Sequence, residues 1–547
     1  MRKPKMDRQR MLDFDDMLEE LGELGKFQIY TYILVCLPVL FAAANSLSYV
    51  FTAGVPDYRC FIPECEDPLD TSYDTPWLKW AIPAEKNSDQ VIGVKADTCD
   101  RFSLNQSAIN TTCSPEMFTK TIEKCSEWIF DNNERTIVND WNITCVENQW
   151  KLSLVGTSHF AGIIVGSCVF GILADWYGRK SIFVICTLLM SISGAVQVVS
   201  PEYITFVSLI FINALGTAGV YPLAFIIGVE MVGKRKREVT GIVLNYFYAL
   251  GEAIVSPIAW YTKDWVHLQL IVSVPAVLFA GYYWIVPESV RWLLANEKND
   301  KAKKIVFKVA KFNNVVLSDN LVDSFKEEAP LTVKGEPDLK EKDKILPVIK
   351  RMLTSRKLIL RFLIMYFIWA VNAFIYYGLS INSTSLGGNK YLNFALVSLI
   401  EIPGYTAAWV CIQKLGRRIS LVGSLLICGV TCTLTIFIAN SSSGSWAVIT
   451  LFLLGKLGVT SSFGVVYVYT AELLPTVIRS GGVGTASTVA RLGALLAPFV
   501  PLLGLHYAPL PMLLFGGVAI LAGLLALYLP ETFGIKLPET AEEAEQI

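Results

Sequence analysis

Four ionisable residues lie inside long apolar stretches of this 547-residue sequence: Glu252, Glu401, Lys456 and Arg491. A charged side chain in such surroundings costs roughly 3 kcal/mol, so it is a candidate for function. Arg491 can hold a carboxylate in a bidentate pair, Lys456 can add a point charge, and Glu401 can hold an ammonium group. These residue types predict a binding site for small organic ions. Glu252 is the weakest member, because it follows Gly251 near the expected end of its stretch.

Each of these residues also has a structural interpretation. Glu401 can simply pair with a basic neighbour, because buried charges usually have partners. Aromatic residues on the same stretches, including Tyr376 and Tyr467, can form a cage for a quaternary ammonium by cation–π attraction, or they can be ordinary helix packing. The sequence leaves these alternatives open.

The stretches that position these residues are long enough to cross a bilayer. Hydrophobic residues make up 53% of the chain and charged residues 17%, whereas soluble domains carry about 25% charged residues. Apolar runs of about twenty residues recur along the chain, as in transmembrane helices. The sequence therefore predicts an all-α membrane protein that has the lipid bilayer as its main solvent. Twelve spans are expected, near residues 27–50, 152–173, 181–199, 203–229, 239–261, 266–286, 358–377, 392–412, 419–438, 446–470, 481–503 and 509–529.

Charged segments divide the chain into five parts. We expect a cytoplasmic N-terminus (1–26), a first six-helix bundle (27–286) with a large extracellular loop (51–150), a lysine-rich cytoplasmic loop (287–357), a second six-helix bundle (358–529) and a cytoplasmic tail (530–547). The basic residues of the N-terminus and of the central loop favour the cytoplasmic side by the positive-inside rule. No cleavable signal peptide is apparent, so the first span is expected to direct insertion. The predicted location is the cell membrane, with many passes.

The large loop carries the signs of an oxidising compartment. It contains six of the 12 cysteines, and an even number in a polar segment predicts disulfides, although six cysteines allow 15 pairings. Three glycosylation sequons lie on the same loop, and their coincidence with the cysteines argues against chance occurrence. The cysteines are Cys60, Cys65, Cys99, Cys113, Cys125 and Cys145, and the sequons begin at Asn105, Asn110 and Asn142.

Polar marks repeat between the two halves of the chain. Glu230 and Arg237 are each followed 242 residues later by the same residue type, at Glu472 and Arg479. The segments 287–289 and 530–532 match at a spacing of 243, and the segments 177–180 and 415–418 match at 238. These spacings predict two homologous six-helix bundles. Secondary transporters have this architecture, with the substrate site between halves that rock about it.

The most specific string is GILADWYGRK at 171–180, which matches the loop signature of the major facilitator superfamily. Asp175 at a helix end can pair with Arg179 or with a basic residue of a neighbouring span, and such a pair can latch a gate. A tight turn without a mechanical role is the alternative. The two repeated pairs, Glu230 with Arg237 and Glu472 with Arg479, are expected to extend this charge network into both halves.

The chain also resembles one family within that superfamily, the organic cation, organic anion and carnitine transporters (solute carrier family 22). The resemblance lies in the strings at 140–145, 287–292, 401–405 and 469–476 and in the cysteine-bearing loop, and insect organic cation transporters look nearest. It implies transport by alternating access. Cation-specialised members carry an acid where this chain has Arg491, whereas anion and carnitine carriers have arginine. This departure weakens the case for a purely cationic substrate.

The leading hypothesis is therefore a carrier of small organic cations or carnitine-like zwitterions. An organic anion exchanger is the alternative, and a membrane receptor that binds organic ions without moving them is a second. An enzyme is not expected, because the sequence shows no phosphate-binding loop, metal cluster or nucleophile constellation and has only 3 His. No cofactor, metal or nucleic-acid partner is predicted, and the identity of a coupling ion is left open.

Overall fold

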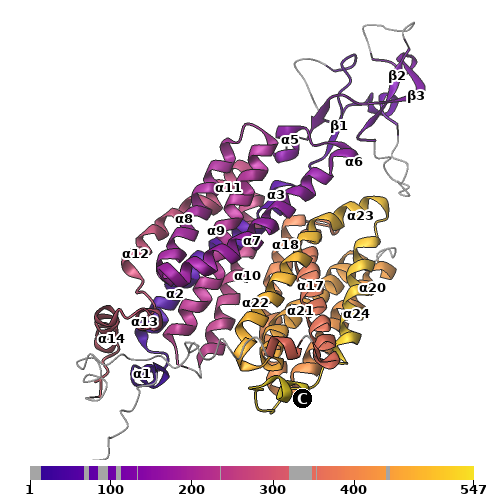
Figure 1. Cartoon of the computed structure of the whole chain (residues 1–547). Coiled ribbons are helices and arrows are strands. Elements are labelled where there is room, and N and C mark those ends of the chain that lie inside the picture. The colour runs from indigo at the N-terminus through magenta and orange to yellow at the C-terminus, as the bar shows by residue number, and fades with distance from the viewer. Residues whose placement is uncertain are drawn as a thin grey trace, which may run out of the picture.

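Two bundles of long helices lie side by side, and a small domain with β-strands projects from one end of the first bundle (Figure 1). The computed structural model describes residues 14–66, 73–83, 97–105, 113–131, 133–233, 236–318, 348–352, 354–438 and 444–546. We call the end that carries the cysteine-bearing domain the loop end. The opposite end carries α1 (Phe14–Glu20), α13 (Val290–Ala295) and α14 (Asn299–Asn313).

Each bundle contains the helices that the hydropathy pattern predicts. The first comprises α2 (Lys26–Leu47), α7 (Trp150–Tyr177), α8 (Arg179–Val196), α9 (Tyr203–Met231), α10 (Arg237–Thr262) and α11 (Trp265–Ser273), which continues through η4 (Val274–Gly281) into α12 (Tyr282–Ile285). The second comprises α17 (Arg356–Asn382), α18 (Lys390–Leu399), α19 (Glu401–Leu415), α20 (Arg417–Ile438), α21 (Gly444–Leu473), α22 (Arg479–Leu496), α23 (Val500–His506) and α24 (Leu510–Ala526).

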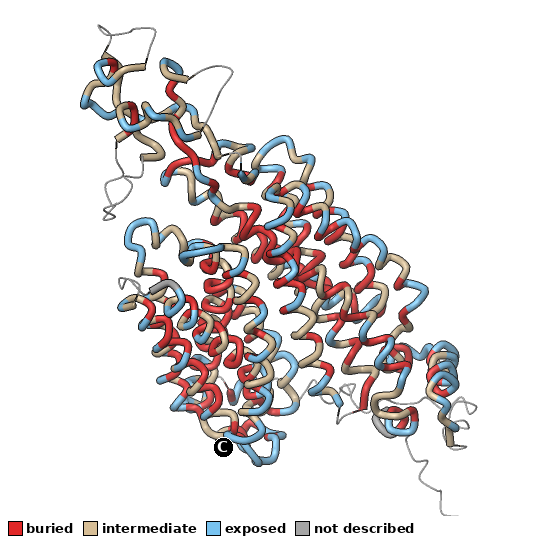
Figure 2. Tube along the Cα trace, turned by 180° about the vertical axis from the view of Figure 1, so that it is seen from behind, coloured by how far each residue is buried: buried red, intermediate tan, exposed pale blue. Residues whose placement is uncertain are grey.

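The surface of the bundles is apolar. Among the described residues, 11 helical segments are long and apolar enough to cross a membrane, and Leu510–Ala526 is a shorter apolar helix. Large apolar side chains stand outward, such as Leu278 at 80% exposure and Phe437 at 74%. Buried residues run through the middle of each bundle, and exposed ones occupy its outer faces (Figure 2). An apolar surface of this extent requires lipid around it, so the predicted membrane fold is confirmed.

The cysteine-bearing loop folds into two small antiparallel sheets, which the expectation of an all-α chain did not include. In one, β1 (Tyr58–Cys60) pairs with β4 (Trp128–Phe130), and in the other β2 (Asp100–Leu104) pairs with β3 (Phe118–Lys124). Two-stranded sheets are marginal alone, and three disulfides crosslink this loop. The disulfides are Cys60–Cys125, Cys65–Cys113 and Cys99–Cys145. The remaining short α-helices of the described residues are α3 (Tyr49–Thr52), α4 (Leu78–Ala81), α5 (Ile137–Trp141), α6 (Cys145–Asn148) and α25 (Ala541–Gln546).

A pair of glycines shows the internal repeat in the packing. Gly251 on α10 touches α2 so closely that an added Cβ would lie 2.2 Å from the carbonyl oxygen of Leu40. Gly493 stands 242 residues later on α22, and its Cβ would lie 2.2 Å from the carbonyl oxygen of Ala370 on α17. Only glycine permits backbones to approach to this distance. The spacing of 242 found in the polar marks therefore holds for the helix packing.

The same repeat appears in how two helices begin at the opposite end. Gly178 and Gly416 precede α8 and α20 with positive φ values of 101° and 87°. In each half, a backbone N–H group in the first turn of this helix donates a hydrogen bond to a glutamate. That glutamate follows the last helix of the same half. Glu288 accepts from the N–H of Lys180 at 3.0 Å, and Glu531 accepts from the N–H of Arg417 at 2.9 Å. Burial raises the pKa of Glu531, but four backbone N–H bonds outweigh it and leave the pKa below its usual value.

Candidate functional site: a buried charge cluster between the bundles

The centre of the site is a buried ion pair. The Lys456 ammonium on α21 lies 2.7 Å from a carboxylate oxygen of Glu401, and both side chains are 0% exposed. The same ammonium donates to the Ser380 hydroxyl at 2.8 Å and to the Tyr376 carbonyl at 3.1 Å. The ammonium is therefore held inside the protein by one ion pair and two hydrogen bonds.

The backbone around Glu401 explains why a carboxylate is held there. α18 ends at Leu399 and α19 begins at Glu401, and Pro403 in the first turn lacks the N–H that would continue the ladder. Glu401 is consequently at the N-terminus of a 15-residue helix, where the helix dipole favours negative charge. Gly404 then lets α19 pack on α21, because an added Cβ would already lie 3.0 Å from Thr460.

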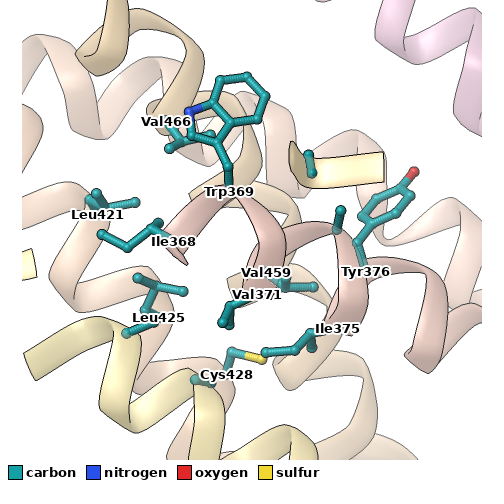
Figure 3. Packing of buried hydrophobic residues seen from close by; sticks show 14 of the residues in the cluster. Ile368, Trp369, Val371, Ile375, Tyr376, Leu421, Leu425, Cys428, Val459 and Val466 are labelled. Carbon is teal, nitrogen blue, oxygen red and sulfur yellow. The ribbon is translucent and has the colours of Figure 1, made fainter. Parts of the chain in front are cut away.

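Tyr376 connects the two charges. Its hydroxyl donates to Glu401 at 2.7 Å, while the Lys456 ammonium lies 3.5 Å from the centre of its ring. Figure 3 shows Trp369 and Tyr376 projecting from α17 on one side, while Val371 and Ile375 face Cys428 on the other. The tyrosine therefore places a cation on an aromatic face, which is the contact expected of an ammonium cage. In this structure, the lysine occupies that face.

Aromatic rings continue from Tyr376 along the inner side of the second bundle. Trp369 lies 4.4 Å from Tyr467, and Tyr376 lies 5.6 Å from Phe463, measured between ring centroids. Tyr467 remains 41% exposed, so part of its ring is open to contact. The predicted aromatic residues are thus brought together next to the charge cluster.

Glu252 enters the cluster from the other bundle. It lies on α10, is 0% exposed, and neither of its carboxylate oxygens has a hydrogen-bond donor among the described residues. Its carboxyl group interacts electrostatically with Glu401 and Lys456 of the second bundle. Glu252, the residue considered weakest from sequence, is therefore fully buried in the interior.

Arg491 lies on α22, half-buried, within electrostatic reach of Tyr377. Among the described residues it forms no ion pair with a carboxylate. Its guanidinium therefore retains its capacity to bind an external carboxylate in bidentate fashion.

The gate residues form one network in each half at the opposite end. In the first half Arg179 lies 3.0 Å from Asp175, and its Nε lies 3.8 Å from Glu230. Arg237 begins α10 nearby in sequence. Asp175, Arg179 and Glu230 all belong to the first half, so these two ion pairs do not connect the halves.

In the second half the partner of Glu472 is Arg417, which binds it in bidentate geometry at 2.7 and 2.9 Å. Arg479 instead donates from Nε to the carbonyl of Ala471 at 2.7 Å, near the end of α21. The repeated sequence pattern had predicted a pair between Glu472 and Arg479. The spacing of 238 residues that links Arg179 to Arg417 was the signal for the observed partner.

The two halves meet directly at the loop end. Glu134 forms an ion pair with Lys390 and accepts a hydrogen bond from the Tyr391 hydroxyl at 2.6 Å. Phe51 of the first half packs on Phe394 of the second, with centroids 5.0 Å apart. A pocket beside these residues is lined by Thr384 and others from both halves. Sequence reasoning missed this contact, because nothing in the spacing relates the loop to α18.

The sequons lie at the loop end with the disulfides. Asn142 is exposed and has a φ of 47°, at the end of α5. Asn105 follows β2, and Asn110 lies outside the described residues. The loop therefore presents at least one accessible acceptor.

Comparison with known proteins identifies the class first. Residues 114–544 match the family model described as "Sugar (and other) transporter". The fold matches the inward open xylose transporter XylE from E. coli, with a TM-score of 0.58 over 95% of this chain and 99% of that chain, at 16% identity. A partially occluded inward open form of XylE matches with a TM-score of 0.60, covering 93% of this chain and 99% of that chain at 15% identity. The chain is a membrane transporter with the major facilitator fold, as predicted.

Its relatives define the family more narrowly. The chain is 33% identical to the Organic cation transporter protein of Drosophila melanogaster, over 98% of this chain and 95% of the relative. It is 31% identical to Organic cation/carnitine transporter 2 of Rattus norvegicus, over 97% of this chain and 94% of the relative. It is also 32% identical to Solute carrier family 22 member 3 of Mus musculus, over 98% of this chain and 96% of the relative. The chain belongs to solute carrier family 22, and the predicted resemblance is confirmed. These relatives are transporters and not enzymes.

Proposed function

We propose that this transporter carries small organic cations or carnitine-like zwitterions across the cell membrane by alternating access. The observation that supports this most is the buried cluster, in which two carboxyl groups face one lysine beside an aromatic wall. Such a cluster has an excess of negative charge that a substrate ammonium can neutralise. The names of the relatives agree with this substrate class.

A test of this function is uptake of labelled tetraethylammonium, L-carnitine and a dicarboxylate into cells expressing the chain. We expect uptake of carnitine or tetraethylammonium above that of control cells. Transport of the dicarboxylate alone would instead establish an organic anion exchanger, the second candidate, which Arg491 favours. Binding of these ions without flux would indicate a receptor.

Arg491 is proposed to bind the carboxylate of a zwitterionic substrate. Replacing it by alanine should lower carnitine uptake by about tenfold to a hundredfold, since charge-assisted hydrogen bonds contribute about 1.5–3 kcal/mol. Tetraethylammonium has no carboxylate and should be affected much less. The measurement is kcat/KM for both substrates in the Arg491→Ala and Arg491→Lys variants. Equal losses for both substrates would remove this role.

We propose that the described state is closed at the loop end and faces the cytoplasm. The contact of Glu134 with Lys390 and Tyr391 joins the halves at the loop end, and the likeness to inward open XylE supports the same assignment. The disulfides and sequons support a loop end outside the cell, and the proposed orientation then has both chain termini and residues 287–357 on the cytoplasmic side. Asp175, Arg179, Glu230, Arg237, Glu472 and Arg479 would then act at the cytoplasmic gate.

The Glu134 contact predicts an effect on the closed state. Glu134→Gln should shift the population toward the outward-facing form by about fivefold, because a partly exposed ion pair is worth up to about 1 kcal/mol. The measurement is labelling of a cysteine introduced at Thr384 by a membrane-impermeant maleimide on whole cells, in a background without the six free cysteines. Glu147→Gln, in an exposed pair with Lys124, is the matched control. An equal labelling rate in both variants would show that Glu134 is not a latch.

A further inference from the structure

The helix α14 carries a lysine-rich face that neither the buried charge cluster nor the gates involve. This 15-residue helix contains five lysines and a single acid, Asp300. None of the five lysines forms an ion pair with a carboxylate of the described residues, and four of them are exposed. A surface with this excess of positive charge attracts anions. The exposed lysines are Lys301, Lys304, Lys308 and Lys311.

The lysines and the packing contacts lie on opposite faces of α14. Its buried residues recur every three or four positions and pack on α1 and α13. Lys304, Lys308 and Lys311 recur at the same spacing on the other face, and we call this face the lysine stripe. Two exposed phenylalanines, Phe307 at 38% and Phe312 at 51%, flank the stripe. Cations beside exposed aromatic rings are typical of a helix at a membrane surface.

Contacts with α2 place the end of α14 at the border of the bilayer. Asn313 accepts a hydrogen bond from the N–H of Phe27 at 2.9 Å, and the rings of Phe27 and Phe312 lie 5.5 Å apart. The outward-facing apolar surface of the span begins within the next two turns of α2, where Tyr30 is 57% exposed and Ile33 46%. Figure 1 shows α14 on the flank of the first bundle that faces away from the second bundle. The lysine stripe is therefore at the level of the lipid headgroups.

We infer that the lysine stripe binds anionic phospholipid headgroups, so that α14 anchors the first half to the inner surface of the membrane. The charges are complementary, because the cytoplasmic leaflet contains anionic lipids and attracts basic segments that lie next to a span. In the proposed orientation, α14 is on that side. Phe307 and Phe312 add apolar contact at the boundary between headgroups and acyl chains. The ligand of the stripe is a lipid, which is distinct from the transported ion.

The test uses the purified full-length chain in nanodiscs, with a fluorophore on a cysteine introduced at Val316 in a background without the six free cysteines. Val316 follows α14, is 95% exposed and lies outside the lysine stripe. The probes are phosphatidylserine and phosphatidylcholine with a nitroxide on one acyl chain, each added to a phosphatidylcholine membrane. Phosphatidylserine should quench the fluorophore at a mole fraction at least about tenfold lower than phosphatidylcholine. Equal quenching by both lipids, or quenching by neither, would overturn the inference.

Two double variants assign the lipid contact to the stripe. Lys308→Gln with Lys311→Gln removes half of the exposed positive charge of α14 and no buried contact. The mole fraction of nitroxide-labelled phosphatidylserine at half-maximal quenching should rise by about tenfold to thirtyfold. Lys79→Gln with Lys120→Gln is the matched control, because both lysines are exposed in the cysteine-bearing domain at the loop end. The same shift in both double variants, or a shift in neither, would exclude the lysine stripe as the lipid site.

Ionic strength tests the electrostatic nature of the contact without changing any lysine. Raising the salt concentration from about 0.1 M to about 1 M shortens the Debye length from about 10 Å to about 3 Å, so the preference for phosphatidylserine should disappear. A preference that survives in the high salt would contradict recognition by charge. These measurements need no transport, so their failure leaves the proposed function intact. Absence of uptake of every ion in the uptake test would refute that function and leave the lipid contact unaffected.

Discussion

Replacing Lys456 by methionine is expected to abolish transport, with uptake per surface molecule reduced by at least about a hundredfold. The substitution keeps an unbranched side chain of nearly the same length but leaves Glu252 and Glu401 without a counter-charge in a fully buried site. Breaking a buried pair by removing one partner costs about 3–5 kcal/mol. The measurement is tetraethylammonium and carnitine uptake normalised to the amount of protein that surface biotinylation detects.

Two further variants separate folding from function in this prediction. Glu401→Gln combined with Lys456→Met removes both charges, so it should recover thermal stability and surface amount without recovering transport. Ser380→Ala removes only a neutral acceptor of the lysine and should be much milder. If the double variant transports like the unmodified chain, the pair is a structural element only.

Gly493→Val is the second substitution with a large expected effect. The new Cβ would lie 2.2 Å from the carbonyl oxygen of Ala370, which is backbone and cannot rotate away. α22 would have to move away from α17 by more than about 1 Å, and overpacking of this kind costs about 1–3 kcal/mol or more. We expect a much lower yield of folded protein and a melting temperature reduced by several degrees in detergent.

Gly484→Ala provides the control on the same helix. A Cβ at Gly484 would meet nothing within 4 Å, so alanine there should be neutral or slightly stabilising, by about 1 kcal/mol at most. Gly251→Val should resemble Gly493→Val, because Gly251 touches Leu40 in the same way. Equal melting temperatures for Gly493→Val and Gly484→Ala would contradict the described contact.

The architecture was predictable because its signals are local or periodic. Apolar runs that are long enough to cross a bilayer predict the helices, and residues repeated at a spacing of 242 predict the two homologous halves. The same spacing carries from Glu230 and Glu472 to Gly251 and Gly493, so a repeat seen in polar residues also holds for a backbone contact. The two sheets of the cysteine-bearing loop were not predicted, because disulfides rather than a strong alternating pattern hold these short strands.

Which charged residues pair with each other in the site was harder to predict from the sequence. Glu401 and Lys456 were both singled out, but a span-by-span view does not show that α19 and α21 bring them to 2.7 Å. The alternative that Glu401 pairs with a basic neighbour matches the observed geometry. Similarly, pairing each gate glutamate with the arginine seven residues later overlooked Arg417, because sequence proximity is a poor guide once a helix ends between two residues. The disulfide partners were open for the same reason.

The charge count of the buried cluster has an electrical consequence. The Glu401–Lys456 pair is neutral as a unit, so a substrate cation that enters without a counter-ion carries its own charge through the membrane field. Moving one elementary charge through a voltage of 100 mV changes the free energy by roughly 2.3 kcal/mol. Tetraethylammonium entry through this chain should then be faster in resting cells than in depolarised cells.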